Sequence, residues 1–248
     1  MKLQKTLFTT LVASLLVTTN AQAFEVIKGE DINDGGPNSH AILNKTRQAE
    51  ANFLNRLDST VGTEDFENIN STTSSGLNLS FPGAGIATLG GNGEIYNIND
   101  ANKKKDVRLA LERGQFPSSK MKYWHTKATP KNTSTFKIDF EEDIAAFGFY
   151  AYDLGDWGAE LSLKLYSDGQ LVGTIQDLHD VQNDGSTTGS AIYVGIIGEL
   201  LEDGDYQSFD RVEFTTTGKG IVNSKSDSFS FDDMTIATAE QLQLAIAD

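Results

Sequence analysis

Short runs in which apolar and polar residues alternate constrain the fold of this chain more than any other feature. The run LNLSF places Leu77, Leu79 and Phe81 on one face of an extended strand. TFKIDF at 135–140 and ELSLKLY at 160–166 repeat the pattern. A period of two is typical of strands with one buried face, because successive side chains point to opposite sides of a sheet. These runs therefore predict a protein made of β-sheets.

Turn-forming residues separate the runs at short intervals. Gly90-Gly91-Asn92-Gly93 and Asp168-Gly169 are expected to form hairpin turns, because Gly, Asn and Asp adopt a positive φ at little cost. About nine short strands with little helix between them favour an all-β, antiparallel, jelly-roll-like β-sandwich over a parallel α/β sheet. Beyond the three alternating runs, strands are expected at 144–152, 171–175, 191–197, 211–216 and 228–236.

Two short helices are expected beside the strands. The apolar residues of AEANFLNRL (49–57) recur at helical spacing after Thr46, which suits an N-cap, and Gly62 is suited to end the segment. This amphipathic helix would cover one end of a sheet. Thr238 and Gln241 have capping-box spacing, which predicts a short helix near the C-terminus.

The first 23 residues have the pattern of a secretory signal peptide. Lys2 and Lys5 precede an apolar run over 7–17, and Ala21-Gln22-Ala23 fits a cleavage site before Phe24. The apolar run is too short for a membrane span, and no later stretch is apolar for long enough. We therefore expect an exported protein without a membrane span, either secreted or periplasmic.

Composition narrows the class of protein further. Residues 24–45 include GEDINDGGPN, which predicts a loosely attached arm, and residues 46–248 form one expected sandwich domain. The chain has no cysteine, so disulfides contribute nothing to its stability. Its formal net charge of −15 repels nucleic acid and anionic lipid and argues against both as partners. Acidic side chains also offer oxygen ligands to divalent cations, although solubility alone explains the charge equally well.

Sequence signals for nucleophilic catalysis are few. His40, His125 and His179 lie in polar, turn-like segments, and the sequence has no Gly-x-Ser-x-Gly elbow. The absence of cysteine excludes a Cys-His pair, and a zinc site of the His/Cys type lacks ligands. We therefore expect a protein that is not an enzyme.

Paired carboxylates leave a secreted glycan hydrolase open as an alternative. In Asp65-Phe66-Glu67 an extended backbone would put both acids on one face and the ring in the core. These acids could act with Asp153 or Asp156, because glycosidases use two carboxyl groups as acid and as nucleophile or base. A solvated acidic face explains the same residues.

The stretch DLGDWG places two carboxylates and two glycines between two predicted strands. Asp153 and Asp156 are three residues apart, and Gly155 and Gly158 let backbone carbonyls turn inward, so the loop can surround one hard cation. A single loop seldom supplies the six to eight oxygens that calcium needs. The loop therefore predicts calcium only if other segments contribute ligands, and a solvated turn is the simpler alternative.

The last predicted strand offers such ligands. In SFSFDDMTI (228–236) the apolar residues change parity at Asp232-Asp233, and a β-bulge there would turn both carboxylates toward the rim of the sheet. A strand covered on both faces is the alternative, because parity then means little. Glu67, Asp232 and Asp233 are accordingly the candidates to complete a calcium shell with the DLGDWG loop.

Four aromatic residues are candidates to bind a ligand. Trp124, Trp157, Tyr123 and Tyr152 lie in or near predicted loops, where exposed rings could stack on sugars. Burial of each ring in the core is the alternative. These residues favour a protein that binds polysaccharide or another surface component, and a purely structural matrix subunit is a further hypothesis.

Five stretches in chain order resemble the extracellular bodies of PEP-CTERM sorting-signal proteins of Gram-negative bacteria. They extend from about residue 49 to residue 241: EANFLNRLDSTVGTEDFENI, FPGAGIATLGGNGEI, GQFPSSKMKYW, FGFYAYDLGDWGAELSLKLY and DSFSFDDMTIAT. The resemblance implies an exported β-sandwich associated with exopolysaccharide, biofilm or the cell surface, and no established enzymatic activity. The chain departs from the family pattern at its end, TAEQLQLAIAD, which lacks a Val-Pro-Glu-Pro-like segment. We therefore expect periplasmic retention or free secretion.

The leader generates a direct prediction. Protein recovered from its native host should begin at Phe24, because the small residues Ala21 and Ala23 define the cleavage site. Mass spectrometry of the intact protein and of its N-terminal peptide would measure this. An exported form that still carries Met1 would contradict it.

Overall fold

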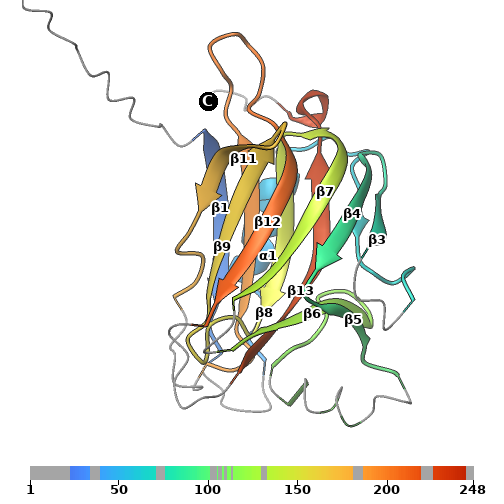
Figure 1. Ribbon diagram of the computed structural model, residues 1–248, viewed down its shortest axis with the longest axis vertical. Helices are drawn as coiled ribbons and strands as arrows, with labels where there is room; N and C mark the ends of the chain where they lie inside the picture. The colour runs from blue at the N-terminus through green and yellow to red at the C-terminus, as the bar shows by residue number, and fades with distance from the viewer. Residues whose placement is uncertain are drawn as a thin grey trace, which may run out of the picture.

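Two antiparallel sheets pack face to face in the computed structural model, which confirms the predicted β-sandwich (Figure 1). Within the described ranges, no helix is both long and apolar enough to cross a membrane. The expected leader covers residues 1–23, of which residues 1–22 lie outside the described part of the chain. The residues that the structure describes are 23–33, 40–70, 76–100, 105, 108, 111, 112, 114–129, 133–180, 187–218 and 226–243.

The first sheet has the strand order β1-β11-β8-β13-β6-β5, and the short β2 pairs with β13. The strands that it contains are all antiparallel to their neighbours. They are β1 (Phe24–Asp31), β2 (Thr63–Glu64), β5 (Glu94–Asn97), β6 (Lys122–Ala128), β8 (Ala146–Tyr152), β11 (Ala191–Gly198) and β13 (Asp227–Ala237).

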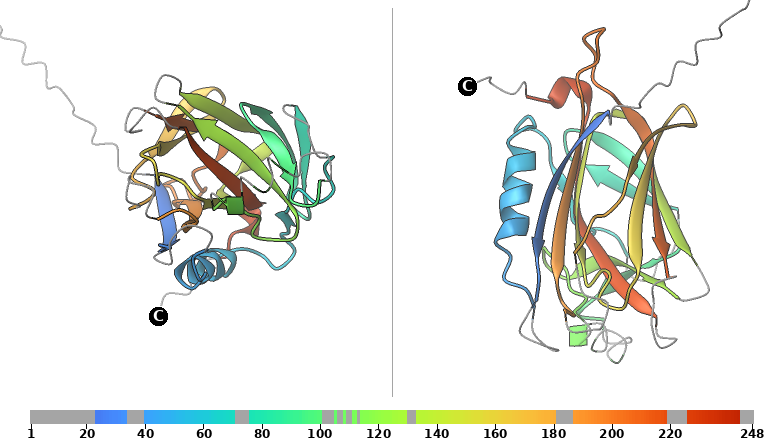
Figure 2. Two further views of the ribbon diagram at one scale, coloured as in Figure 1. Left: turned by 90° about the horizontal axis from the view of Figure 1, so that it is seen from below. Right: turned by 90° about the vertical axis from the view of Figure 1, so that its left-hand side faces the viewer.

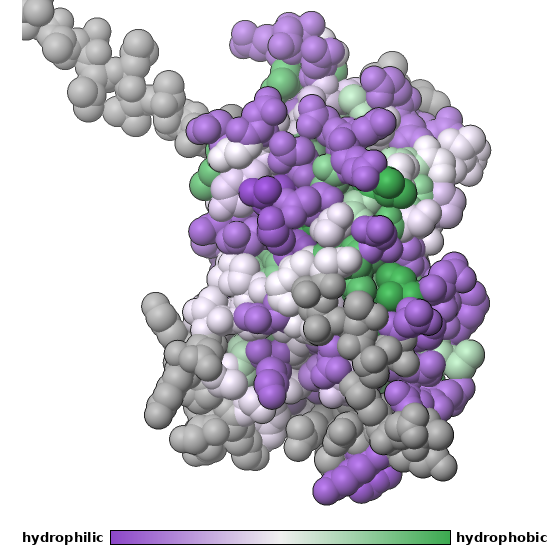
Figure 3. Space-filling view, turned by 45° about the vertical axis from the view of Figure 1, so that its right-hand side comes forward, coloured by the Kyte–Doolittle hydropathy of each residue, from purple (hydrophilic) through white to green (hydrophobic). Residues whose placement is uncertain are grey.

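The second sheet has the strand order β10-β9-β12-β7-β4-β3 and keeps one face toward water. Its buried and exposed residues alternate, as in LNLSF, because only one side of each strand meets the core. On the side of the molecule shown in Figure 3, hydrophilic side chains predominate and hydrophobic ones form small groups. The strands are β3 (Leu77–Phe81), β4 (Gly85–Gly91), β7 (Ser134–Ile144), β9 (Glu160–Ser167), β10 (Gln170–Ile175) and β12 (Phe209–Thr217).

Aromatic rings fill the space between the sheets. Phe136 and Phe214 of the second sheet stack at a centroid distance of 4.2 Å. Phe231 and Phe149 of the first sheet meet this pair edge-on, at 5.0 Å from Phe136 and 5.2 Å from Phe214. Burial of each such ring stabilises the fold by about 1.5–3 kcal/mol, so this cluster is a large part of the core.

Helix α1 (Lys45–Leu54) covers the outer face of the first sheet, over β1 and β11 (Figure 2). Phe53 of the helix is fully buried there against the backbone of Gly148 and Gly195. A Cβ atom on Gly195 would lie 2.5 Å from the Phe53 ring, so only glycine permits this approach. The central strands of the first sheet are therefore buried on both faces, and β8 and β11 are apolar or small at nearly every position.

A second segment covers the outer face of the same sheet farther along β13. The Gln115 side chain donates to the carbonyl of Ser228 at 2.9 Å, and the Ser230 hydroxyl donates to the carbonyl of Phe116 at 3.2 Å. The Phe116 ring lies 4.2 Å from that of Tyr152. Residues 115–119 thus run along β13 and shield its outer side chains from water.

The expectation of a loose arm at 24–45 is wrong for its first part. Residues 24–31 form β1, which pairs along its whole length with β11, from Phe24 opposite Gly198 to Asp31 opposite Ala191. Glycine, asparagine and aspartate suggested a loop, but the partner strand lies far away in the sequence and local composition does not reveal it.

Two other boundaries differ from expectation. The helix ends at Leu54 rather than near Gly62, because Leu57 pairs with Leu242 instead of continuing the helix. Gly90-Gly91-Asn92-Gly93 does not form a hairpin, since β4 belongs to the second sheet and β5 to the first. The expected C-terminal capping box is confirmed at Thr238, where it begins a short 3₁₀ helix over 239–241.

Asp31 joins the edge strand to the helix. One of its carboxylate oxygens accepts hydrogen bonds from the backbone N–H of Asn44 and Thr46 and from the Thr46 hydroxyl, all at 2.8–2.9 Å, and the other accepts from the Lys45 N–H at 3.0 Å. These donors are the free N–H groups of the first helical turn, so an aspartate on β1 caps α1. Burial acts to raise the pKa of Asp31, but these hydrogen bonds outweigh it and lower the pKa.

We predict that Asp31→Asn lowers the free energy of unfolding by about 1–3 kcal/mol, because buried donors lose a charged acceptor. The lowered pKa in the folded state means that the contribution of Asp31 is present above about pH 4 and is lost as the pH falls through the folded-state value. Urea unfolding at pH 7 and pH 3 would measure both effects. The exposed Asp143, changed to Asn, is the matched control, and equal losses in the two variants would contradict the role of Asp31.

Candidate functional site

Three aspartates lie together at the end of the sandwich where β8 ends and β13 begins. They are Asp153, Asp156 and Asp227, with side chains that are 3%, 1% and 0% exposed. We call them the buried carboxyl cluster. The first two belong to the DLGDWG loop and were expected to act together, whereas Asp227 was not expected to take part.

The loop after β8 turns at Asp153, which has a φ of 62°. The Asp153 Oδ1 atom accepts a hydrogen bond of 2.8 Å from the Gly189 N–H. The Thr188 hydroxyl donates to Asp156 Oδ2 at 2.8 Å. Both acids therefore connect their own loop to the turn that precedes β11.

Asp227 meets the same loop from the start of β13. Its Oδ2 atom accepts hydrogen bonds from the N–H of Trp157 at 3.3 Å and from that of Ala159 at 3.0 Å. A sequence signal for this contact exists, because Asp227 has the same parity as the core residues Phe229 and Phe231. An acid at a core-facing strand position is buried, and it must find partners inside the protein.

Burial controls the electrostatics of the cluster. It raises the pKa of Asp153 well above the usual value, and the adjacent Asp156 raises it further, against the lowering effect of the Gly189 N–H. Burial, and again the proximity of Asp156, raise the pKa of Asp227 to about 8. The cluster therefore requires a proton or a positive charge at neutral pH.

The expected β-bulge at Asp232-Asp233 is confirmed. The register of β13 on β8 shifts between Asp232 and Thr235, and Asp233 has a φ of 46°. The Asp232 Oδ2 atom accepts hydrogen bonds from the N–H of Ser118 at 2.8 Å and of Ser119 at 3.2 Å. The bulge therefore anchors the segment that covers β13.

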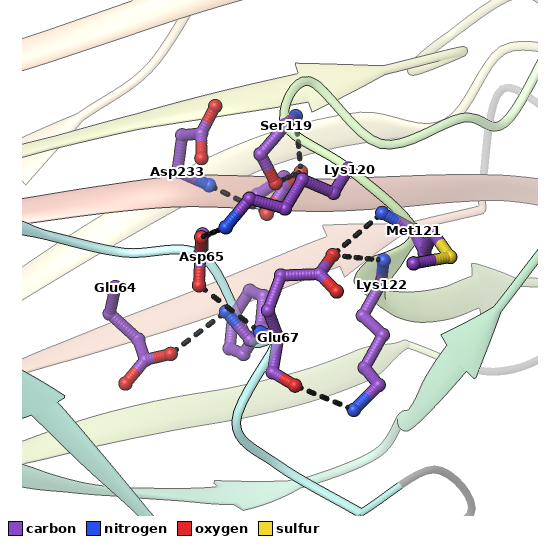
Figure 4. Close-up of polar contacts among 10 residues, drawn as sticks. Glu64, Asp65, Glu67, Ser119, Lys120, Met121, Lys122 and Asp233 are labelled. Carbon is purple, nitrogen blue, oxygen red and sulfur yellow. Dashed lines mark hydrogen bonds and ion pairs between the residues drawn. The ribbon is translucent and has the colours of Figure 1, made fainter.

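Glu67 and Asp65 contact residues 120–122, which directly follow the covering segment 115–119 (Figure 4). Glu67 Oε1 accepts hydrogen bonds from the N–H of Met121 at 2.6 Å and of Lys122 at 2.7 Å. Asp65 pairs with the Lys120 ammonium at 3.2 Å. Phe66 has a φ of 57°, so these residues form a turn, not the strand that alternation suggested.

The candidate metal ligands thus fall into two groups. Asp153 and Asp156 contact the turn before β11, whereas Glu67, Asp232 and Asp233 surround residues 118–122. The structure does not bring the two groups to one shared cation, and it does not place Asp65 or Glu67 opposite Asp153 as a hydrolase would require. Among the described residues, no three histidine or acidic side chains form a ready metal centre.

Three of the four aromatic candidates are fully buried. Tyr123 and Trp124 lie in β6 and Tyr152 lies in β8, each 0% exposed, so their rings offer no face to a ligand. This corrects their expected role, because the Trp124 ring faces the core between the sheets and the Tyr152 ring packs against that of Phe116 on the outer face of the first sheet. Trp157 is half-buried in the DLGDWG loop. The Trp124 indole instead packs against the backbone of Gly93. A Cβ atom at this position would lie 2.3 Å from the indole, so the contact requires glycine.

A groove of about 360 Å³ opens beside β5 and β6 and contains aromatic residues that the sequence analysis did not select. Tyr96 and His125 line it as a stacked pair, with centroids 4.2 Å apart and planes within 17°. Both are half-buried, and both lie on the face of the sheet opposite Trp124 and the core. Asn92, Glu94 and Lys127 are among the polar residues that line the same groove.

Comparisons with known proteins give only distant similarities. No family model matches the chain, and no curated protein matches it. The adhesin domain K2 of Lys-gingipain is 12% identical over 73% of this chain and 99% of that chain, with a TM-score of 0.40. A cyclase from Fischerella sp. TAU is 10% identical over 73% of this chain and 96% of that chain, with a TM-score of 0.39.

A structure from Clostridium perfringens ZmpB, which contains two CBM32 domains and an M60 catalytic domain, is also similar. It is 15% identical over 74% of this chain and 17% of that chain, with a TM-score of 0.31. All three TM-scores are low, so what this chain binds has to be inferred from its own residues.

The two tryptophans allow a test of which rings are accessible. We predict that Trp124, isolated in a Trp157→Phe variant, emits at short wavelength and is quenched by acrylamide several-fold less than Trp157, isolated in a Trp124→Phe variant. The reason is that only the Trp157 side chain reaches solvent. Fluorescence quenching measures both, and equal quenching would contradict the burial of Trp124.

Proposed function

We propose that the chain is an exported, non-enzymatic β-sandwich protein that binds polysaccharide in the groove beside β5 and β6. The observation that carries this proposal is the stacked Tyr96–His125 pair on the groove wall. A sugar ring has a C–H face that packs on an aromatic ring and hydroxyl groups at its edge. A binding site for it therefore needs an aromatic surface with polar groups around it.

The lining of the groove meets both needs. Tyr96 lies opposite Tyr123 in the pairing of β5 with β6, with ring centroids 5.8 Å apart, and this neighbour together with His125 restricts its orientation before a ligand arrives. Asn92 and Glu94 offer acceptors and Lys127 offers donors within the same groove. A preorganised ring with polar neighbours binds with little loss of side-chain entropy.

Overall charge favours one class of polysaccharide. The formal net charge of −15 repels uronic acid and sulfated polymers at long range. Neutral polysaccharides escape this repulsion, so we infer that the groove takes a neutral glycan.

Other lines of support concern location and activity. The N-terminal leader pattern and the resemblance to PEP-CTERM bodies support export to the periplasm or the exterior. The contacts of the acids proposed for a hydrolase favour a binding protein over an enzyme. Asp65 and Glu67 bind residues 120–122, and Asp153 is buried in a different part of the molecule.

The test is binding to a panel of neutral glucans, galactans and mannans, with alginate as the anionic comparison. We predict that at least one neutral polymer binds, and that Tyr96→Ala weakens its Kd about tenfold, equivalent to ~1.4 kcal/mol. Affinity electrophoresis would identify the polymer and isothermal titration calorimetry would measure the Kd. Tyr166→Ala is the matched control, because Tyr166 lies half-buried on β9 in the other sheet.

The same experiment distinguishes the proposed function from the alternatives. A Tyr96→Ala variant that binds as tightly as the wild type would exclude the groove. Release of reducing ends from a polymer would identify a hydrolase. Concentration-dependent assembly without affinity for any glycan would identify a structural matrix subunit.

A further inference from the structure

We propose that the free edge of β1 is an interface between two copies of this chain, which pair their β1 strands antiparallel about a two-fold axis. This inference goes beyond glycan binding and does not depend on it. In the right-hand view of Figure 2, β1 lies at the near edge of the first sheet, beside α1. The groove beside β5 and β6 lies at the opposite edge of that sheet, so pairing through β1 leaves the groove open.

The hydrogen-bond pattern identifies the backbone groups of β1 that face outward. The N–H of Glu199 donates to the carbonyl of Ala23 at 3.0 Å, so the odd-numbered residues of β1 direct their N–H and C=O groups toward β11. The even-numbered residues, from Phe24 to Glu30, direct theirs to the free edge. Among the described residues, none hydrogen-bonds to these outward groups. The edge therefore offers a row of donors and acceptors to another strand.

The other sheet edges each have a feature that hinders pairing with a further strand. β10 has a register shift between Leu171 and Gly173, and β5 has only four residues. At β3 the N–H of Ser80 donates to a Glu64 carboxylate at 2.9 Å. Bulges, short strands and covering segments are the usual protection of an edge. β1 instead pairs with β11 over eight residues without a register shift and contains no proline, so its outer edge is long and regular.

The side chains of β1 favour a second copy of this chain as the partner. A two-fold interface brings the same surface of both subunits together, so that surface has to be complementary to itself. If two β1 strands pair about Gly29, Lys28 lies opposite Glu30 of the second copy, and the reciprocal pair forms as well. Opposite charges at facing positions stabilise a strand pair. In the same register Ile32, which is 41% exposed, lies opposite Val26 of the second copy.

Both charged side chains are already held within their own subunit. The Lys28 ammonium donates to the carbonyl of Asp177 at 3.4 Å, and the Glu30 carboxylate accepts the N–H of Asp180 at 2.9 Å. These contacts involve the side chains of β1, so residues 177–180 leave its backbone edge free. They also restrict the two charges before a partner arrives, which lowers the entropy lost on association.

A groove of about 670 Å³ along the same edge supplies further self-complementary groups. One wall is β1, and the other carries the amides of Asn44, at the N-cap of α1, and of Gln48 and Asn52. Residues four apart lie on one side of a helix, so these amides form a row. An amide both donates and accepts hydrogen bonds, so two such rows can pair with each other across a two-fold axis.

Sedimentation velocity of the mature protein, in about 0.15 M salt and without glycan, tests the proposal. Salt at this concentration screens the repulsion between two acidic copies. We predict a reversible monomer–dimer equilibrium between about 1 and 200 µM, the range of a small, transient interface. A monomer at every concentration would overturn the proposal.

Charge reversal locates the interface. Lys28→Glu changes two contacts at once, because the axis repeats the pair, and should weaken the dimer Kd about tenfold. The double variant Lys28→Glu with Glu30→Lys restores opposite charges and should regain most of the affinity. Lys164→Glu is the matched control, because β9 is an inner strand of the other sheet. Equal dimerisation of the wild type and Lys28→Glu would contradict this interface.

A proline variant tests the backbone of the edge. Lys28→Pro removes an N–H that faces outward and none that bonds to β11, so it should abolish the dimer and leave the Tm nearly unchanged. If this variant does not fold, hydrogen exchange of the wild type decides. The amides of Val26 and Lys28 should exchange rapidly in dilute protein and slowly in concentrated protein, whereas those of Ile27 and Gly29 should be slow in both. A dimer that leaves exchange at Val26 and Lys28 unchanged would place the interface elsewhere.

Discussion

The first sheet is buried on both faces along its central strands, β8, β11 and β13, and most other features of the molecule depend on this constraint. The second sheet packs on its inner face, while α1 and residues 115–119 cover the outer one. A strand without a solvated side must satisfy every polar group inside the protein. Asp232 meets this requirement by accepting the N–H groups of the covering segment, and Tyr150 does so by donating to Glu50 at 2.8 Å. The buried carboxyl cluster is the place where neutral donors do not suffice.

The same constraint explains which parts of the fold could be predicted from the sequence. Strands of the second sheet have one wet face, so their alternation predicts them directly, as at LNLSF. β8 and β11 carry no alternation, yet their runs of β-branched, aromatic and small residues still indicate strands. β1 was not predicted, because its partner lies about 170 residues away and local composition does not encode that pairing. At Gly91–Gly93 the chain passes from the second sheet to the first and packs closely on Trp124. This contact is also between residues far apart in the sequence, so the local sequence does not reveal it.

The candidate site was predicted in part for equally physical reasons. Asp153 and Asp156 stand out because acids beside glycines between two strands are unusual, and the structure does bring them together. Their expected partner was chosen by a parity change, which proved to be a true bulge that serves a different segment. Asp227 had a weaker sequence signal, which is an acidic residue at a strand position that faces the core. Tyr96 carried no local signal, since only the pairing of β5 with β6 places it on His125.

The first residues of β1 also bear on the order of events during export. Phe24 is 3% exposed, its ring packs 5.7 Å from that of Phe209, and the carbonyl of Ala23 accepts a hydrogen bond from the Glu199 N–H at 3.0 Å. A protease must hold the chain extended on both sides of the bond that it cuts, and a docked strand does not allow this. Removal of the proposed leader at this bond therefore has to precede the pairing of β1 with β11. The edge strand β1 would then join the sheet, and Asp31 would cap α1, only after the leader has gone.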